Sequence, residues 1–149
     1  MNIFEVCVNI KIKKLSKDAV IPSHAKIGDV GLDLTAVSIS YTDNYIEYGT
    51  GLAIEIPEGF GGFIFPRSSI SNYDLSFCNS VGVIDTNYRG ELKIRFNTIY
   101  NYQLNKKLYD IGDRIGQLII MPIPKIKLQV VDDLDITNRN SLGFGSSGV

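Results

Sequence analysis

Apolar and polar residues alternate along several short stretches of the chain. In residues 4–12, the apolar side chains from Phe4 to Ile12 would face one side and the residues between them the other. A period of two residues is typical of a strand with one buried face, and a short apolar run between turns is consistent with a strand buried on both faces. The pattern therefore predicts alternating strands at 4–12, 52–56, 92–96 and 126–130, and fully buried strands at 60–65 and 115–121.

Helical periodicity is weak throughout the sequence. Apolar residues at helical spacing never persist for three turns, and the one helix that we expect is short, near 68–75, beginning after Pro66. Clusters of Gly, Pro, Asn and Asp separate the predicted strands as turns would. No internal repeat, linker or low-complexity block divides the chain, so we interpret residues 1–149 as a single domain. Many short strands in one domain predict an all-β fold: a sandwich, a jelly roll or a small barrel.

Composition narrows the classes of partner. The 149 residues are 44% apolar and 21% charged, an ordinary globular mix for one domain with its own core. A net charge of −1 argues against a broad nucleic-acid-binding surface, and no apolar run reaches the roughly 18–20 residues of a membrane span. The N-terminus lacks a secretion signal, and Cys7 and Cys78 match no metal-site spacing. We therefore expect no nucleic acid or membrane partner and a cytoplasmic, intracellular location, with a nuclear or host-cell location left open.

The histidine count restricts the chemistry. His24 is the only histidine, which excludes every multi-histidine metal site and argues against a Ser-His-Asp triad. A surface histidine in a loop is the simpler interpretation of this residue. If the chain is an enzyme, we expect its general base to be a carboxylate.

Two segments place charged or polar groups within or beside an apolar strand pattern. Residues 31–34 carry Asp33 inside an apolar run, where a carboxylate needs a partner, a hydrogen bond or a nearby cation. Residues 66–69 offer a guanidinium, two hydroxyls and free backbone N–H groups at a helix start, which suit anionic oxygens. Each also has a structural explanation, as a buried structural acid and as an ordinary helix start.

Two further segments add polar groups to strand ends. Residues 79–91 read as a hairpin with Asp85 and Tyr88 near its tip, and residues 112–117 bring a charge pair and Gln117 into a strand. A packed tyrosine and a surface ion pair after a turn would explain them equally well. From the residues alone, the chain is a β-rich binder of phosphate esters, with hydrolytic activity left open.

The C-terminal stretch 139–148 is rich in Gly and Ser and contains one aromatic residue. Such a sequence buries little apolar surface and loses much conformational entropy when it is ordered. It is therefore either a frayed terminus or a tail that orders over a ligand, with Phe144 stacking and Arg139 pairing with an anion.

Five segments together resemble the motifs of the homotrimeric dUTPase family (deoxyuridine triphosphate nucleotidohydrolases). They follow one another in the family's order, and the third, with the pattern NSxGxIDxxYRGE, is the most specific. Several tail residues depart from the family pattern; Asn140 and Leu142 stand where glycine is common and would stiffen the tail. The five segments are 29–36, 66–70, 79–91, 112–120 and 139–148.

The resemblance implies a jelly-roll-like β-barrel with one short helix, and a homotrimer with shared active sites. It also implies Mg²⁺-dependent hydrolysis of dUTP to dUMP and pyrophosphate, which limits uracil incorporation into DNA and supplies dUMP for dTMP synthesis. Asp85 matches the family carboxylate that activates the water attacking the α-phosphate. Residues 139–149 match a flexible arm that closes over the active site.

The resemblance assigns the remaining site residues to parts of the substrate. Tyr88 matches the aromatic residue beneath deoxyribose, and Asp33 matches an acid that contacts Mg²⁺ through water. The uracil-binding positions are Asn79, Gly82, Val83 and Ile84, and Lys93 is also placed with the substrate-binding residues. The phosphate-contacting positions are Arg67, Ser68, Ser69 and Gln117. In the arm, Phe144 would stack over uracil, and the γ-phosphate would be closed in by Arg139, Gly145, Ser146 and Ser147.

Three other interpretations compete with this one. A dCTP deaminase shares the fold and binds a related nucleotide, but its members carry a different hairpin signature. A catalytically silent binding module on the same fold would not need Asp85 and Tyr88. A plain β-sandwich lectin or structural domain would not need five motifs in order.

Overall fold

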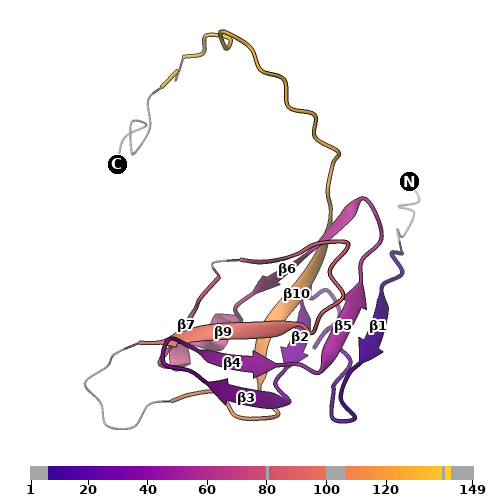
Figure 1. Ribbon diagram of the computed structural model, residues 1–149, viewed down its shortest axis with the longest axis vertical. Coiled ribbons are helices and arrows are strands. Elements are labelled where there is room, and N and C mark those ends of the chain that lie inside the picture. The colour runs from indigo at the N-terminus through magenta and orange to yellow at the C-terminus, as the bar shows by residue number, and fades with distance from the viewer. Residues whose placement is uncertain (1–6, 80, 100–106, 139, 142–149) are drawn as a thin grey trace.

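The computed structural model of the protein describes residues 7–79, 81–99, 107–138 and 140–141. Within these ranges the fold is all-β, with one short 3₁₀ helix, η1 (Ser68–Asn72), as Figure 1 shows. The described strands are β1 (Lys11–Lys14), β2 (Leu32–Thr35), β3 (Ser38–Tyr41), β4 (Ile46–Gly49), β5 (Leu52–Glu55), β6 (Phe60–Phe65), β7 (Leu75–Phe77), β8 (Gly82–Ile84), β9 (Lys93–Thr98) and β10 (Arg114–Pro122).

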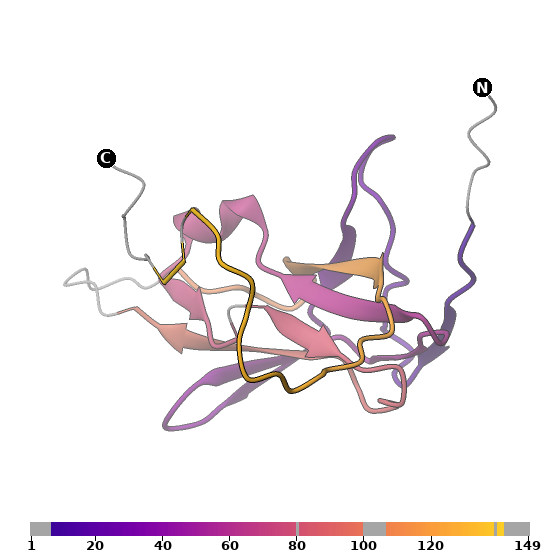
Figure 2. The same cartoon turned by 90° about the horizontal axis from the view of Figure 1, so that it is seen from above.

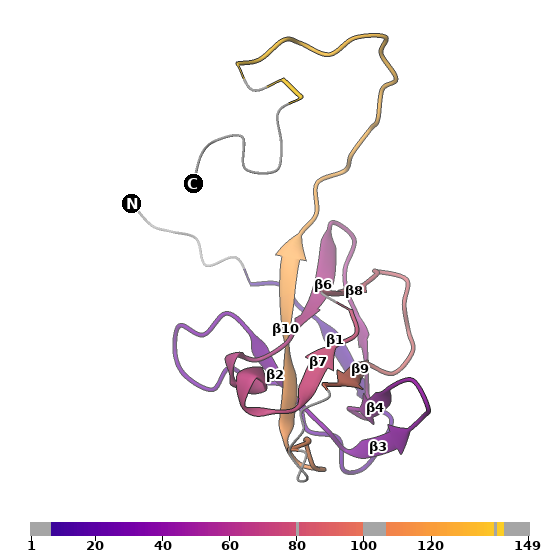
Figure 3. The same ribbon diagram turned by 90° about the vertical axis from the view of Figure 1, so that its left-hand side faces the viewer.

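The strands are divided among three sheets, and the described strands do not close into one barrel. One four-stranded sheet has the order β2-β10-β6-β8, the other has the order β3-β4-β9-β7, and β1 pairs with β5 in a small third sheet. Every pairing is antiparallel. Figure 2 shows the two larger sheets as two layers, and Figure 3 shows the long strand β10 between β2 and β6.

The core fills the space between the two layers. Leu34, Ile64 and Leu118 come from one sheet, and Tyr48 and Phe96 from the other, all of them buried. The Tyr48 ring meets the Phe96 ring edge to face, with the centroids 5.6 Å apart. The Tyr48 hydroxyl donates a hydrogen bond to the backbone carbonyl of Tyr109 at 3.1 Å, and burial raises the pKa of Tyr48 to about 12. Apolar burial of this kind dominates the stability of the fold.

Most of the strand predictions are confirmed. The predicted strands at 52–56, 60–65, 92–96 and 115–121 correspond to β5, β6, β9 and β10, and the short helix falls inside the predicted range. The all-β class is therefore confirmed. The strand predicted at 4–12 is observed only at its end, since β1 covers Lys11–Lys14, residues 7–10 lie outside it and residues 1–6 lie outside the described part.

The prediction of a strand at 126–130 is wrong, because these residues form no strand within the single chain. After β10 the chain runs away from the sheets, as Figures 1 and 3 show, and forms no strand within 123–138. Its apolar side chains face solvent: Leu128 is 90% exposed and Val130 is 99% exposed. The alternating pattern is present, but none of the strands in the described part of the chain pairs with it. We call residues 126–136 the exposed segment.

The described part of the chain has no helix with the length and apolar character that a membrane crossing requires.

Candidate active site

Six of the predicted substrate-binding residues line one pocket of about 260 Å³. The pocket lies where the loop 79–91 meets β4 and β9, and we call it the nucleoside pocket. Residues from two layers of the fold therefore line a single cavity. The six residues are Asn79, Gly82, Val83, Ile84, Tyr88 and Lys93.

Strand β8 brings unpaired backbone groups to this pocket. It forms the edge of its sheet, and its three residues pair with β6 alone, with Ile84 opposite Gly62 and Gly82 opposite Ile64. One side of an edge strand keeps free N–H and C=O groups, which can bind a ligand that carries both donors and acceptors. The pairing also corrects the predicted hairpin: β8 has no partner strand inside 79–91, and the chain passes on to the other sheet at β9.

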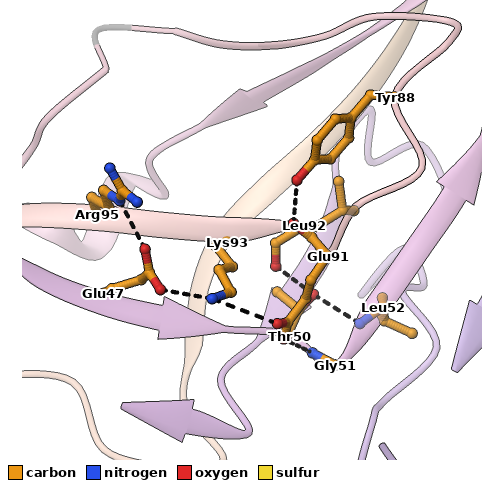
Figure 4. A network of polar contacts seen from close by, with 9 residues as sticks. All are labelled: Glu47, Thr50, Gly51, Leu52, Tyr88, Glu91, Leu92, Lys93 and Arg95. Atoms are coloured by element: carbon orange, nitrogen blue, oxygen red, sulfur yellow. Dashed lines mark hydrogen bonds and ion pairs between the residues drawn. The ribbon is translucent and has the colours of Figure 1, made fainter. Parts of the chain in front are cut away.

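A tight turn follows β8 and fixes the tyrosine. The backbone N–H of Tyr88 donates to the carbonyl of Asp85 at 3.1 Å, and the Tyr88 hydroxyl donates to the carbonyl of Glu91 at 2.9 Å (Figure 4). The Tyr88 ring lies against Gly90, where a Cβ atom would collide with the tyrosine hydroxyl. The glycine is therefore required so that the ring can fold back over the turn. The predicted position of Asp85 and Tyr88 at a turn is confirmed by this geometry.

The Asp85 side chain is exposed and lies outside the nucleoside pocket. It lines a neighbouring hollow of about 730 Å³, together with Thr86, Asn87 and Lys125. A carboxylate in this position is accessible to water and to a ligand that extends out of the nucleoside pocket.

Charged side chains on β4 and β9 form a network beside the nucleoside pocket (Figure 4). The Glu47 carboxylate accepts hydrogen bonds from Lys93 Nζ and from Arg95 Nε, each at 2.8 Å. The Lys93 hydrogen bond, the Arg95 hydrogen bond and the two positive charges hold the pKa of Glu47 below its ordinary value, although burial opposes the shift. The hydrogen bond to Glu47 in turn raises the pKa of Lys93. The pairs are therefore ionised at neutral pH.

Glu91 connects this network to the core. Its Oε1 atom accepts a hydrogen bond from the backbone N–H of Gly51 at 2.8 Å, and its Oε2 atom lies 3.9 Å from Lys93 Nζ. The adjacent Thr50 side chain is buried and donates to the carbonyl of Leu92 at 2.7 Å. These bonds fasten the turn between β4 and β5 to the beginning of β9.

Most of the predicted phosphate-contacting residues line a second pocket, of about 240 Å³. Gly31, Asp33, Arg67, Ser68 and Gln117 are among its lining, and we call it the phosphate pocket. Figure 3 shows η1 beside β2 and the loop that leads into it. This pocket shares no lining residue with the nucleoside pocket.

Asp33 is the centre of the phosphate pocket. Its carboxylate accepts from Arg67 Nε at 2.9 Å and from Arg114 Nη1 at 2.8 Å. A second nitrogen of Arg67 donates to the Ser69 hydroxyl at 3.3 Å. The predicted need of Asp33 for a cationic partner is thus met twice. Asp29 also lines this pocket, so two carboxylates and two guanidinium groups gather here, and the guanidinium N–H groups are the donors that an anionic ligand could use.

Gln117 is fixed within the same pocket. Its side-chain Nε2 atom donates to the carbonyl of Pro66 at 3.0 Å, and its side-chain oxygen lies over Gly31, where no Cβ atom would fit. The glycine therefore allows the amide to lie flat between β2 and the chain that follows β6.

The two pockets are well separated within one chain. Ile84, the residue before Asp85, pairs with Gly62 on β6, and Arg67 lies five residues further along the chain in an extended conformation. At about 3.3 Å per residue, five extended residues span about 16 Å, which is the approximate separation of the backbones near Asp85 and Arg67.

Several charged residues of these clusters, Arg114, Arg95 and Glu47 among them, were not predicted as site residues. Arg114 belonged to a segment already singled out, but its expected partner was Asp113, whereas its guanidinium pairs with Asp33. Arg95 occupies a polar position of an alternating strand, and Glu47 carries no sequence signal of its own. The cluster arises only because Glu47 is opposite Arg95 in the β4–β9 register.

The predicted arm lies almost entirely outside the described residues. Arg139, Phe144, Gly145, Ser146 and Ser147 all fall there, and the structure describes only residues 140–141 of the arm. Asn140 has a φ of 42°, in the left-handed region that asparagine tolerates better than most residues. The local backbone is therefore one that glycine would also adopt.

Among the described residues, no three His, Cys, Asp or Glu side chains gather as metal ligands would. Asp33 is the carboxylate nearest to the predicted phosphate-contacting side chains, and each of its oxygens already accepts one hydrogen bond. A carboxylate oxygen has a second lone pair, so a water-mediated contact with Mg²⁺ is compatible with this arrangement.

The fold and the two pockets together define a class: an all-β protein with one pocket lined by an edge strand, a tyrosine and a lysine, and a second pocket lined by Arg67, Ser68 and Gln117. A sequence model described as dUTPase matches residues 17–148 of the chain, so the chain belongs to the dUTPase family.

Relatives match over nearly the whole chain. It is 36% identical over 146 residues to the deoxyuridine 5'-triphosphate nucleotidohydrolase of Hydrogenobaculum sp. (strain Y04AAS1), covering 95% of this chain and 99% of that protein. It is 38% identical over 147 residues to the protein of the same name from Corynebacterium glutamicum, covering 93% and 94%. The structure of the Staphylococcus bacteriophage 80alpha dUTPase with dUPNHPP is similar, with a TM-score of 0.81 and 28% identity over 95% of this chain and 99% of that one. The family resemblance seen in the sequence is confirmed.

Proposed function

We propose that this chain hydrolyses dUTP to dUMP and pyrophosphate. The observation that carries the proposal is the nucleoside pocket, in which an unpaired strand edge, a fixed tyrosine and a lysine converge. Relatives that match nearly the whole chain are named as enzymes of this activity, and a similar solved structure holds dUPNHPP. The activity would limit uracil incorporation into DNA and supply dUMP for dTMP synthesis in the cytoplasm.

The edge of β8 would select the base. Uracil presents two carbonyl acceptors and one N–H donor, and the free backbone of Gly82, Val83 and Ile84, with the Asn79 amide, can match them. Cytosine has an acceptor in place of the N3–H donor and an amino donor in place of one carbonyl, so it would leave polar groups unpaired in the pocket, which is costly. The Tyr88 ring, held over Gly90, would pack beneath the sugar and leave no room for a 2′-hydroxyl.

The phosphate pocket would bind the charged end of the nucleotide. Arg67, Ser68, Ser69 and Gln117 would contact the phosphate oxygens, since a guanidinium and hydroxyls suit them well. When bound to the triphosphate, Mg²⁺ neutralises charge on the phosphate oxygens and favours departure of pyrophosphate. Asp33 would hold such an ion indirectly, through water.

Asp85 would act as the general base. Its carboxylate would accept a proton from a water molecule, whose oxygen attacks the α-phosphorus while the bond to the pyrophosphate oxygen breaks. The exposed position of Asp85, in a hollow that adjoins the nucleoside pocket, supports this role.

The active site would combine parts of different copies of the chain in a homotrimer. One nucleotide must contact Asp85 near its α-phosphate and Arg67 at its other phosphates, but the backbones of these residues are about 16 Å apart within one copy. The exposed segment supports the same conclusion. Its alternating apolar residues match a strand, and a second copy can supply the surface that its own chain lacks.

Residues 139–149 would close over the bound nucleotide, with Phe144 stacking on uracil and Arg139 on the γ-phosphate. A segment that orders only over substrate would exclude water from the reaction. Deleting residues 139–149 should therefore reduce kcat at least about tenfold while the fold stays intact by circular dichroism. Unchanged kinetics in the truncated chain would contradict this role.

The decisive experiment incubates the purified chain with Mg²⁺ and, separately, dUTP, dCTP, dTTP and UTP, with products resolved by chromatography. We expect dUMP and pyrophosphate from dUTP alone. Deoxyuridine products from dCTP would indicate a deaminase instead, and no turnover by a folded assembly would indicate a binding module. Light scattering on the same sample should give a mass of three chains; an active monomer would contradict the shared site.

A further inference from the structure

Glu47 holds two cations in place although its own carboxylate is recessed. The Glu47 side chain is 14% exposed, whereas those of Lys93 and Arg95 are 43% and 52% exposed. The carboxylate thus lies beneath the two cations, as Figure 4 shows, and each of its oxygens accepts one hydrogen bond. Of the three, Lys93 is the one predicted to contact the substrate.

Arg95 restricts the carboxylate from the other side. Its guanidinium lies over the Tyr45 ring, with the central carbon 4.4 Å from the ring centroid, while Nε bonds to Glu47. The β4–β9 register sets Glu47 directly opposite Arg95 and sets Gly49 opposite Lys93. A Cβ atom at Gly49 would collide with the Ser38 and Glu91 side chains, so the glycine makes room for Glu91 beside Lys93.

The Lys93 ammonium keeps donors for a ligand. An ammonium has three N–H donors and no acceptor. One donor serves Glu47 at 2.8 Å, and Glu91 at 3.9 Å lies beyond hydrogen-bond distance, so two donors have no partner among the described residues. Two carboxylates and two cations line this pocket, so it carries no excess charge. A pocket with that balance suits an uncharged acceptor, such as a carbonyl or hydroxyl oxygen, better than a polyphosphate.

We propose that Glu47 is a positioning residue that holds the Lys93 ammonium as a hydrogen-bond donor to the uncharged nucleoside part of the bound nucleotide. This role rests on the proposed function and adds a residue that acts on the substrate only through another. Without the carboxylate, the four-carbon stem of Lys93 can point its ammonium toward solvent.

A second ion pair in the chain serves as a matched control. Lys11 Nζ bonds to Glu55 Oε1 at 2.9 Å across β1 and β5, and neither residue lines the nucleoside pocket. Glu55→Gln removes the same kind of bond from the same kind of strand pair. An effect on ligand binding that appears in Glu47→Gln alone therefore cannot come from the loss of a cross-strand ion pair as such.

The test measures binding of deoxyuridine, dUMP and inorganic pyrophosphate to the full chain by calorimetry. We expect Glu47→Gln to weaken deoxyuridine and dUMP by the same factor, about 5- to 20-fold, and to leave pyrophosphate unchanged. For dUTP hydrolysis, KM should rise and kcat should stay within about twofold, because the lost contact exists before the reaction. Glu55→Gln should bind all three ligands like the parent.

Lys93→Met completes the test. The methionine keeps an apolar stem of similar length on an exposed position, so folding is preserved even if Glu47→Gln is unstable. Lys93→Met should show the same loss for deoxyuridine, and the double variant should be no weaker than Lys93→Met, because Glu47 acts through the lysine.

Three results would overturn the inference: parent-like deoxyuridine binding by Lys93→Met, additive losses in the double variant, or a loss confined to pyrophosphate. A lower melting temperature of Glu47→Gln with unchanged binding would make the cluster purely structural. Failure of the proposed function is distinct, because a parent chain that neither binds deoxyuridine nor hydrolyses dUTP fails before any variant is compared.

Discussion

Two clusters in this molecule each pair one carboxylate with two cations, but the cations and the surrounding residues differ. In each, one carboxylate accepts hydrogen bonds from two cations at 2.8–2.9 Å: Asp33 from Arg67 and Arg114, and Glu47 from Lys93 and Arg95. The pocket around Asp33 contains a second acid, Asp29, and both cations that pair with Asp33 are guanidinium groups. The Glu47 cluster is balanced by Glu91, the second acid in its pocket.

The difference shows how one kind of ion-pair cluster can serve two parts of a ligand. Two guanidinium groups suit phosphate oxygens, which they can bind through paired donors, whereas the Lys93 ammonium, held by a carboxylate, offers single donors. The partners also differ in how they are brought together. Lys93 and Arg95 are two residues apart on one strand, but Asp33, Arg67 and Arg114 come from three distant segments.

The largest effect on kcat is expected at Asp85. This residue adjoins the nucleoside pocket but would act at the α-phosphorus. Asp85→Asn keeps the shape of the side chain and removes the base, so kcat should fall about 10²- to 10⁴-fold. Binding of dUMP should be unchanged, as measured by calorimetry. Asp43→Asn, in the turn between β3 and β4, is the matched control and should be fully active. Turnover by Asp85→Asn within a few-fold of the parent would show that another group is the base.

Arg67→Met tests whether the two pockets bind different parts of the nucleotide. Loss of a charge-assisted contact to phosphate should weaken pyrophosphate binding about 10- to 100-fold. Deoxyuridine binding to the same variant should equal that of the parent, because the nucleoside pocket contains no part of Arg67. Equal losses for both ligands would mean that the pockets are not independent.

Replacing Arg114 or Arg95, the more exposed cation of each cluster, should have a smaller effect on ligand binding. Arg114→Met removes one of the two cations that pair with Asp33 and should weaken pyrophosphate binding about 3- to 10-fold. Arg95→Met removes the equivalent cation from Glu47 and should leave pyrophosphate binding unchanged. Calorimetric titrations of the two variants with pyrophosphate make the comparison. If both variants lost affinity equally, long-range charge rather than pocket identity would explain the effect.

The smallest effect concerns the stability of the balanced cluster at low pH. The pKa of Glu47 in the folded chain lies below its ordinary value of 4.5, so its ion pairs stabilise the fold fully above that pH. The contribution, about 0.5–1 kcal/mol for such an exposed network, is lost as the pH falls through the lowered pKa. Urea unfolding between pH 6 and pH 3 should therefore show a smaller pH dependence in Glu47→Gln than in the parent. Parallel curves would show that Glu47 titrates normally.

The local pattern of apolar and polar residues predicts much of the fold. Strands β5, β6, β9 and β10 follow from alternation or apolar runs, because the same residues that set the pattern face the core. Strands β3 and β4 were not predicted, since each is four residues long and has few apolar positions. The exposed segment has a true strand pattern, but a pattern cannot indicate whether the partner strand belongs to the same chain.

The site shows the same limit. The turn at Asp85 and the grouping of residues 79–91 were visible in the sequence, because turn chemistry is local. The pairing of β8 with β6 and the cluster around Glu47 depend on strand register, which joins residues more than 40 positions apart in the Glu47–Arg95 case. Arg114 illustrates the point: its neighbour Asp113 was the expected partner, and the observed partner is 81 positions away.

The exposed segment has a thermodynamic consequence. If its apolar side chains are covered only by another copy, part of the free energy of folding comes from association and follows mass action. The melting temperature would then fall on dilution, by an amount that grows with the apolar area that the segment buries. A variant with Leu128 and Val130 replaced by serine would lose this concentration dependence, and its stability would be that of a solitary chain. The stability of this protein would then depend on its own concentration as well as on its sequence.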